Sequence, residues 1–320
     1  MRSSLDNTRG WDHHLAPWLD PGNTPGVSVC RLVIEGRVVV LSRLRVPGAD
    51  SRRNLQVMAY LGDSTSPTGQ QVLALAPAWA EQPPPGRDTL DLGALTGTVA
   101  EHAETLERHA RVAARELAPV VAAALRTPGT ALSVLTQGDT RAQAWALAQM
   151  FELALGRRIE TFSTYESDDL RPGTDVIFLR QWPGASSRAS QRQRVDLTAP
   201  PVTDHDDEIA ALIVEAYAQG TLESLTLQLN LTSDTPADQR IELLHQALSL
   251  PPSAAPTSAP VEPAASTRLP PSSRRPWPRQ KLPLRCRHSA RRQNLHRPAS
   301  ATARPMTHPW PPCRRHFRTC

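Results

Sequence analysis

Histidines and carboxylates gather in one stretch where they could bind a metal ion. His102 and His109 lie two helical turns apart, among Glu101, Glu104 and Glu107. A carboxylate-bridged metal site built on helices needs a Glu-x-x-His pair from each of two helices. No Glu-x-x-His pair occurs in this stretch. We therefore interpret the stretch as the solvated, charged face of a helix.

Two other groups have metal-ligand residue types but weak spacing. The string Asp204-His205-Asp206-Asp207 could hold Mg²⁺, yet acids in the first turn of a helix explain it without a metal. Cys286, Cys313 and Cys320 lie among histidines near the C-terminus at irregular spacing, unlike the paired ligands of zinc modules. The sequence therefore assigns no metal ligands.

Signatures of catalysis are missing as well. The turn Thr136-Gln137-Gly138-Asp139 has one glycine and an acid where a phosphate-binding loop needs several glycines. No GxSxG nucleophile motif occurs, and Gly62-Asp63-Ser64 is interpreted as a loop turn. Cys30 lies inside an apolar run, which is typical of a buried, inert thiol. We assign no catalytic and no cofactor-binding residue.

The first elements of the body are predicted to form an antiparallel sheet. Val27–Ile34 and Arg37–Leu44 are β-branched runs, and the two-residue link Glu35-Gly36 between them favours a tight hairpin. A third apolar segment, Leu55–Leu61, follows after a loop.

A βαβ unit is predicted in the middle of the chain. Ala131–Thr136 and Ile159–Thr164 have the composition of strands, and Asp139 is placed to cap a helix over Thr140–Leu155. A helix between two strands makes the strands parallel and the crossover right-handed. Further strands are expected at Val176–Leu179 and, at an edge, Arg194–Leu197.

Four more helices are predicted from apolar spacing and end signals. The longest runs from Thr98 to Arg126, with Glu101 completing a capping box and Pro119 kinking its last turns. The others are expected at 70–80, from Asp204 to Gly220 and from Thr235 onward, while Leu222–Leu231 alternates like a strand and stays ambiguous. The fold class is thus α/β, with a mixed sheet.

Composition changes abruptly near Leu250. Residues 251–320 hold fourteen Lys and Arg against one acid, so this tail carries +13; the whole chain carries +5, which leaves −8 for residues 1–250. Fifteen prolines in the tail oppose regular structure. Three readings remain: an out-of-frame sequence, a disordered tail, or an arm that binds nucleic acid. Residues 1–26 are expected to be irregular and 27–250 to form one domain, with a division near 85–95 left open.

The setting is predicted to be the cytoplasm. No run approaches the roughly 18 uncharged apolar residues that span a bilayer. Met1–Asp20 mixes charged residues and histidines with no apolar core of a signal peptide. We therefore expect no membrane partner.

Two short stretches resemble one protein family. Phe162-Ser163-Thr164-Tyr165-Glu166, after a strand–helix segment, is similar to the FSTYE string of the bacterial GTPase-associated protein 1 family. A stretch upstream resembles that family's Gly-Asp…Arg-x-Asn pattern, although Tyr60 replaces its histidine and Arg52 a glycine; its matching residues are Gly48, Asp50, Arg53 and Asn54. The resemblance covers roughly residues 37–183 and implies a non-enzymatic component encoded with small GTPases. From the residues alone, the string suits a strand.

These observations lead to one functional hypothesis and two alternatives. We expect a non-catalytic adaptor or regulatory module that binds a protein, such as a small GTPase or a neighbouring component of its system. The first alternative is nucleic-acid binding through the basic tail. The second is an enzyme with an unrecognised site, whose mark would be a deep pocket lined by His102, Glu101 or Asp139.

Overall fold

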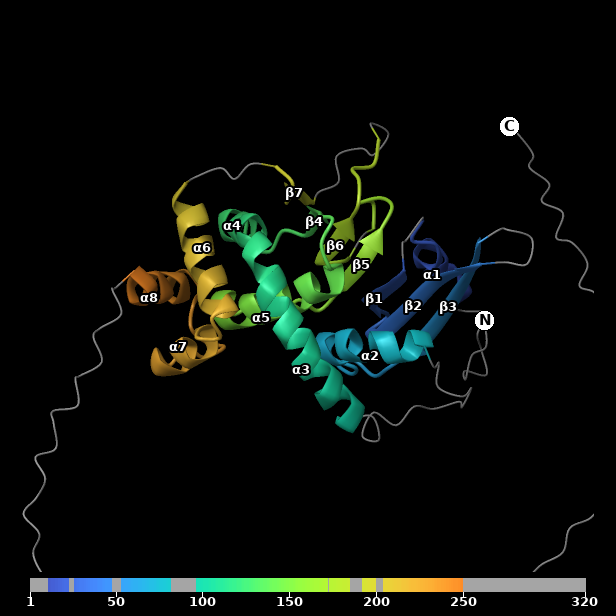
Figure 1. Cartoon of the computed structure of the whole chain (residues 1–320), viewed down its shortest axis with the longest axis horizontal. Coiled ribbons are helices and arrows are strands. Elements are labelled where there is room, and N and C mark those ends of the chain that lie inside the picture. Colours follow the sequence, from blue (N-terminus) through green and yellow to red (C-terminus); the bar gives the residue numbers. More distant parts are fainter. Residues whose placement is uncertain are drawn as a thin grey trace, which may run out of the picture. The chain divides into compact units, whose positions relative to one another are not determined.

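A computed structural model describes most of the chain before residue 250 (Figure 1). The described residues are 11–22, 26–47, 53–81, 96–171, 173–184, 192–199 and 204–249. They belong to one compact unit that spans Met1–Thr257. Three features of the sequence lie outside the described residues. They are the tail, the possible domain division near residues 85–95, and Gly48 and Asp50 of the stretch that resembles the GTPase-associated family.

A mixed seven-stranded sheet confirms the predicted α/β class. Its strand order is β3-β2-β1-β5-β6-β4-β7. The first three strands pair antiparallel, and β1 also pairs antiparallel with β5, where the parallel half begins. The strands are β1 (Val27–Ile34), β2 (Arg37–Pro47), β3 (Arg53–Leu61), β4 (Leu132–Leu135), β5 (Phe162–Glu166), β6 (Val176–Leu179) and β7 (Gln193–Asp196).

The predicted hairpin is present with the expected turn. Glu35 and Gly36 have φ angles of 51° and 72°, and Ile34 pairs with Arg37. Positive φ at both central residues defines the type I′ turn, whose twist matches that of the two strands. The link Glu35-Gly36 thus sets the register of β1 and β2.

The predicted βαβ unit is also present, with one addition. Helix α5 (Thr140–Leu155) begins after Asp139, whose side chain accepts hydrogen bonds from the backbone N–H groups of Arg141 and Ala142. It ends at Gly156, which adopts the left-handed conformation. Strands β4 and β5 are parallel as predicted, but β6 lies between them and pairs with both.

The long helix predicted over Thr98–Arg126 is divided. Helix α3 (Thr96–Ala113) leads into a 3₁₀ turn (Ala114–Glu116), and α4 (Ala118–Arg126) follows with Pro119 in its first turn. A proline is tolerated there because first-turn N–H groups have no helical partner. Since the helix already includes Thr96, the capping box predicted at Thr98 is wrong.

The remaining helices lie close to their predicted positions. They are α2 (Gly69–Glu81), α6 (His205–Ala218), α7 (Leu222–Gln228) and α8 (Ala237–Ser249). Helix α7 resolves the ambiguous leucine-rich segment. Its buried residues Leu222 and Thr226 are four apart, which is helical spacing rather than alternation.

One helix lies where irregular structure was expected. Helix α1 (Asp12–Leu19) packs Leu15 and Trp18 in a cluster with Cys30, Leu32, Val39 and Leu41 on one face of the antiparallel strands. The larger core lies on the opposite face, where buried residues of α2 to α6 pack against the sheet. The sheet is therefore covered on both sides in its antiparallel half.

Candidate binding site: an acidic cavity beside α3

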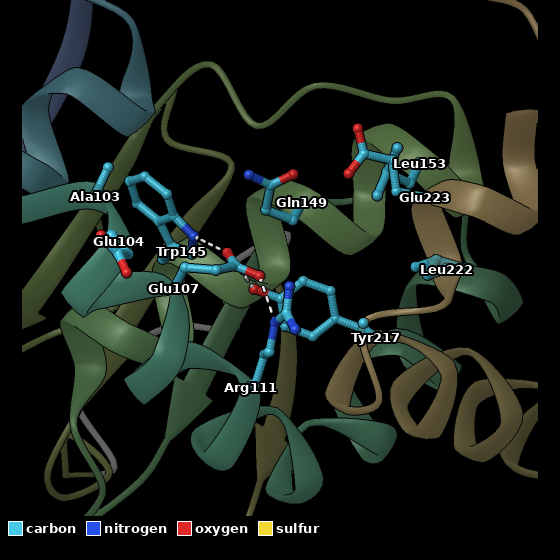
Figure 2. Close-up of a pocket in the computed structure, with 11 residues that line it drawn as sticks. Ala103, Glu104, Glu107, Arg111, Trp145, Gln149, Leu153, Tyr217, Leu222 and Glu223 are labelled. Atoms are coloured by element: carbon cyan, nitrogen blue, oxygen red, sulfur yellow. Dashed lines mark hydrogen bonds and ion pairs between the residues drawn. The ribbon is translucent and has the colours of Figure 1, made fainter. Parts of the chain in front are cut away.

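A cavity of about 340 Å³ opens among the helices that cover the larger core (Figure 2). Helices α3 and α5 supply most of its wall, and the end of α6 and the start of α7 complete it. Its lining residues are Ala103, Glu104, Glu107, Arg111, Trp145, Gln149, Leu153, Tyr217, Gly220, Leu222 and Glu223.

Glu107 is the centre of the polar contacts in this cavity. The indole Nε1 of Trp145 donates a hydrogen bond to its Oε2 atom at 2.6 Å, and the hydroxyl of Tyr217 donates to the same oxygen at 3.1 Å. The Nε atom of Arg111 donates to Oε1 at 2.9 Å. Three helices therefore hold one carboxylate in a fixed orientation.

Helical spacing explains why these side chains share a face. On α3, Ala103, Glu107 and Arg111 follow one another at intervals of four residues, which places them along one stripe. On α5, the lining residues Trp145, Gln149 and Leu153 have the same interval. Buried Trp and Tyr side chains usually place their polar atom on a partner, and Glu107 is that partner for both.

The cavity is acidic. Its lining includes the carboxylates of Glu104, Glu107 and Glu223 and one guanidinium, that of Arg111, which leaves two uncompensated negative charges. Burial, followed by the charge of Glu107, raises the pKa of Tyr217 far above its usual value. The phenol therefore stays neutral and acts as a hydrogen-bond donor.

Arg111 lies against a glycine on the opposite wall. Gly220, just beyond α6, has a φ of +74°, and a Cβ atom built on it would overlap the Nη1 atom of Arg111. A larger residue would therefore displace the guanidinium as well as strain the backbone. Gly220 both ends the helix and leaves room for Arg111.

The histidine stretch considered in the sequence contributes to this cavity only in part. Glu104 and Glu107 line it, whereas Glu101, His102 and His109 do not. Asp139, the other residue named as a mark of an enzyme pocket, is the N-cap of α5 and is also absent from the lining. The three residues named for the enzyme alternative, Glu101, His102 and Asp139, are therefore not part of this cavity.

The acidic string at 204–207 forms a helix start. Asp204 accepts a hydrogen bond from the backbone N–H of Asp207, and the Asp207 side chain accepts one from the N–H of Asp204. Arg126 contacts both carboxylates. This capping box confirms the helix-start interpretation, and no group of three or more potential ligands in the described part of the chain is arranged for a metal ion.

The string Phe162–Glu166 forms β5 and holds a buried ion pair. Glu166 Oε1 contacts Nη1 of Arg43 at 2.8 Å, and both side chains have no solvent exposure. The Ser163 hydroxyl accepts from Arg43 and donates to Glu166. These contacts support a structural role for the string.

The predicted burial of Cys30 is confirmed. Its side chain is fully buried, and burial is the main reason that the pKa of its thiol rises to about 12. A thiol with this pKa is protonated at neutral pH and is a poor nucleophile.

Comparisons with models of protein families, with curated proteins and with solved structures found no match. Within the described residues, no helix combines the length and the apolar character that crossing a membrane requires. The fold and the cavity thus define an α/β protein with an acidic, partly aromatic pocket between helices.

Proposed function

We propose that this chain is a non-catalytic adaptor that binds a protein partner through the acidic cavity beside α3. The observation that carries the proposal is the cavity itself: three carboxylates, one guanidinium and two aromatic side chains line a recess of about 340 Å³. Recognition sites often combine aromatic walls with a few fixed polar groups. The excess of acid favours a partner with a basic surface.

Several contacts support a binding role over a catalytic one. Glu107 is engaged by three donors, so it is held as a fixed charge. Tyr217 keeps its proton because its pKa is raised, and Cys30 lies buried among α1 and the strands, outside the cavity. The lining of the cavity therefore carries fixed negative charge, and neither Tyr217 nor Cys30 provides it with an activated nucleophile.

Helix α7, which contributes to the cavity wall, also carries an exposed apolar side chain. Leu227 of α7 is 74 % exposed, and it lies one turn beyond Glu223, which lines the cavity. Protein interfaces commonly combine an apolar contact with charges at its border. We propose a small GTPase, or a neighbouring component of its system, as the partner. This choice rests on the resemblance of β5 and of the stretch near Arg53 to the GTPase-associated family.

The test compares capture of partners by variants of the full chain. Wild-type protein and the double variant Glu104→Gln/Glu223→Gln serve as baits in lysate from the native host. Glu101→Gln/Glu208→Gln removes two exposed charges elsewhere and is the matched control. We expect a partner that wild type and control retain and that the cavity variant loses. Equal capture by all three, or capture of no specific protein, would refute the proposal.

A further inference from the structure

Arg111 is the cationic side chain of the cavity lining. Its Nε atom donates to Oε1 of Glu107, while Oε2 accepts from Trp145 and Tyr217. The two fixed donors on Oε2 orient the carboxylate, so that Oε1 is presented to a guanidinium. The site is therefore already built around the group that Arg111 supplies.

The Arg111–Glu107 pair is exposed enough to exchange. The side chains are 44 % and 27 % exposed, and the two residues are four apart on the same helix. Pairs of this kind add little to stability because water screens them. A second cation could thus replace Arg111 at small cost, since the two excess charges of Glu104 and Glu223 attract it.

We propose that the cavity binds the guanidinium of an arginine on the partner, which replaces Arg111 on Glu107. This inference rests on the proposed adaptor function and names the chemistry of its ligand. A guanidinium suits the site better than an ammonium because it is planar, weakly hydrated and packs well on aromatic rings. Trp145 and Tyr217 provide such rings in the lining.

Gly220 gives an independent way to move Arg111. Gly220→Ala would place a methyl group against the guanidinium of Arg111, so the flexible end of that side chain must shift, and we expect its pairing with Glu107 to weaken. Gly129 follows α4 with a φ of +83° and has open space around it. Gly129→Ala therefore carries a similar backbone strain without displacing any side chain, and it is the matched control.

The experiment follows the indole N–H signal of Trp145 by ¹H–¹⁵N NMR in the full chain, with Trp145→Phe identifying the signal. The probes are acetyl-Ala-Arg-Ala-amide, its lysine analogue and its citrulline analogue, which keeps the shape of arginine without the charge. We expect a saturable shift with the arginine peptide, a weaker response to lysine and none to citrulline. Arg111→Gln should bind the arginine peptide roughly 1.5- to 5-fold more tightly, because it removes the competing cation.

Variants of the chain test whether the arginine of the peptide replaces Arg111 on Glu107. Gly220→Ala should tighten binding as Arg111→Gln does, whereas Gly129→Ala and Arg108→Gln, an exposed α3 change outside the cavity, should not. Equal binding of the arginine and citrulline peptides, or no tightening in Arg111→Gln, would overturn the inference. The cavity variant could lose its partner while wild type fails to bind the arginine peptide. That result would support the adaptor function and reject only the proposal that the cavity binds a guanidinium.

Discussion

Neutralising Glu166 should destabilise the protein more than neutralising any exposed acid. Arg43 and Glu166 are both fully buried and 2.8 Å apart. Removing one member of such a pair leaves the other charge without compensation, at a cost of about 3–5 kcal/mol. Glu166→Gln keeps the shape of the side chain and removes its charge.

The contacts of Arg43 place the expected loss near the lower end of that range. Its guanidinium also donates to the backbone oxygens of Trp18 and Tyr165 and to the hydroxyls of Ser28 and Ser163. These acceptors remain in Glu166→Gln. We therefore expect a loss of about 3 kcal/mol in the free energy of unfolding.

The assay is urea denaturation followed by circular dichroism, with Glu160→Gln as control. Glu160 pairs with the buried Arg31, but it is itself 56 % exposed, so its neutralisation should cost about 1 kcal/mol or less. Arg43→Met/Glu166→Gln should lose less than the sum of the two single changes because both charges are removed together. A loss in Glu166→Gln no larger than in Glu160→Gln would refute the reasoning.

Three further predictions concern single groups. Asp139→Ala removes the cap of α5 and should lower the free energy of unfolding by about 1 kcal/mol in urea denaturation; no change would mean that the cap contributes nothing. Hydrogen bonds from Arg126 and the backbone lower the pKa of Asp204 to about 2, below its value of about 3.9 in the unfolded chain. The contribution of this carboxylate to the free energy of unfolding is therefore present above pH ~4 and lost as the pH falls toward ~2. The free energies of unfolding of wild type and Arg126→Gln, measured by urea denaturation, should approach each other over that range. A difference that stays constant with pH would contradict the prediction. Iodoacetamide at pH 8 should leave Cys30 unmodified in the folded protein and label it in urea, as read by peptide mass spectrometry; labelling of the folded protein at the unfolded rate would disprove its burial.

Elements set by neighbouring residues could be predicted from the sequence. The turn Glu35-Gly36 requires only local backbone angles, and both residues adopt them. The ends of α5 depend on Asp139 and Gly156, whose capping chemistry is also local. In contrast, α1 depends on Leu15 and Trp18 packing against β1 and β2, so a local reading of its proline-rich surroundings missed it.

The candidate site was only partly accessible to the same reasoning. Glu104 and Glu107 stood out as charge on α3, but their role depends on residues far along the chain. Trp145 and Tyr217 reach Glu107 across 38 and 110 positions. Glu107 can be recognised as a site residue only once the packing of α5 and α6 on α3 is known.

The contacts of β5 change what its family-like string can mean. Strands β1 and β5 pair through only two residue pairs, Cys30 with Ser163 and Arg31 with Phe162. Beyond these pairs a side chain replaces the backbone as the hydrogen-bond partner: the hydroxyl of Thr164 accepts a hydrogen bond from the backbone N–H of Val29 at 2.9 Å. Phe162, Thr164 and Tyr165 are of types that favour strands, and Ser163 and Thr164 supply polar contacts at this junction. These contacts give the string a structural explanation, and the proposed binding role therefore rests on the acidic cavity among α3, α5, α6 and α7.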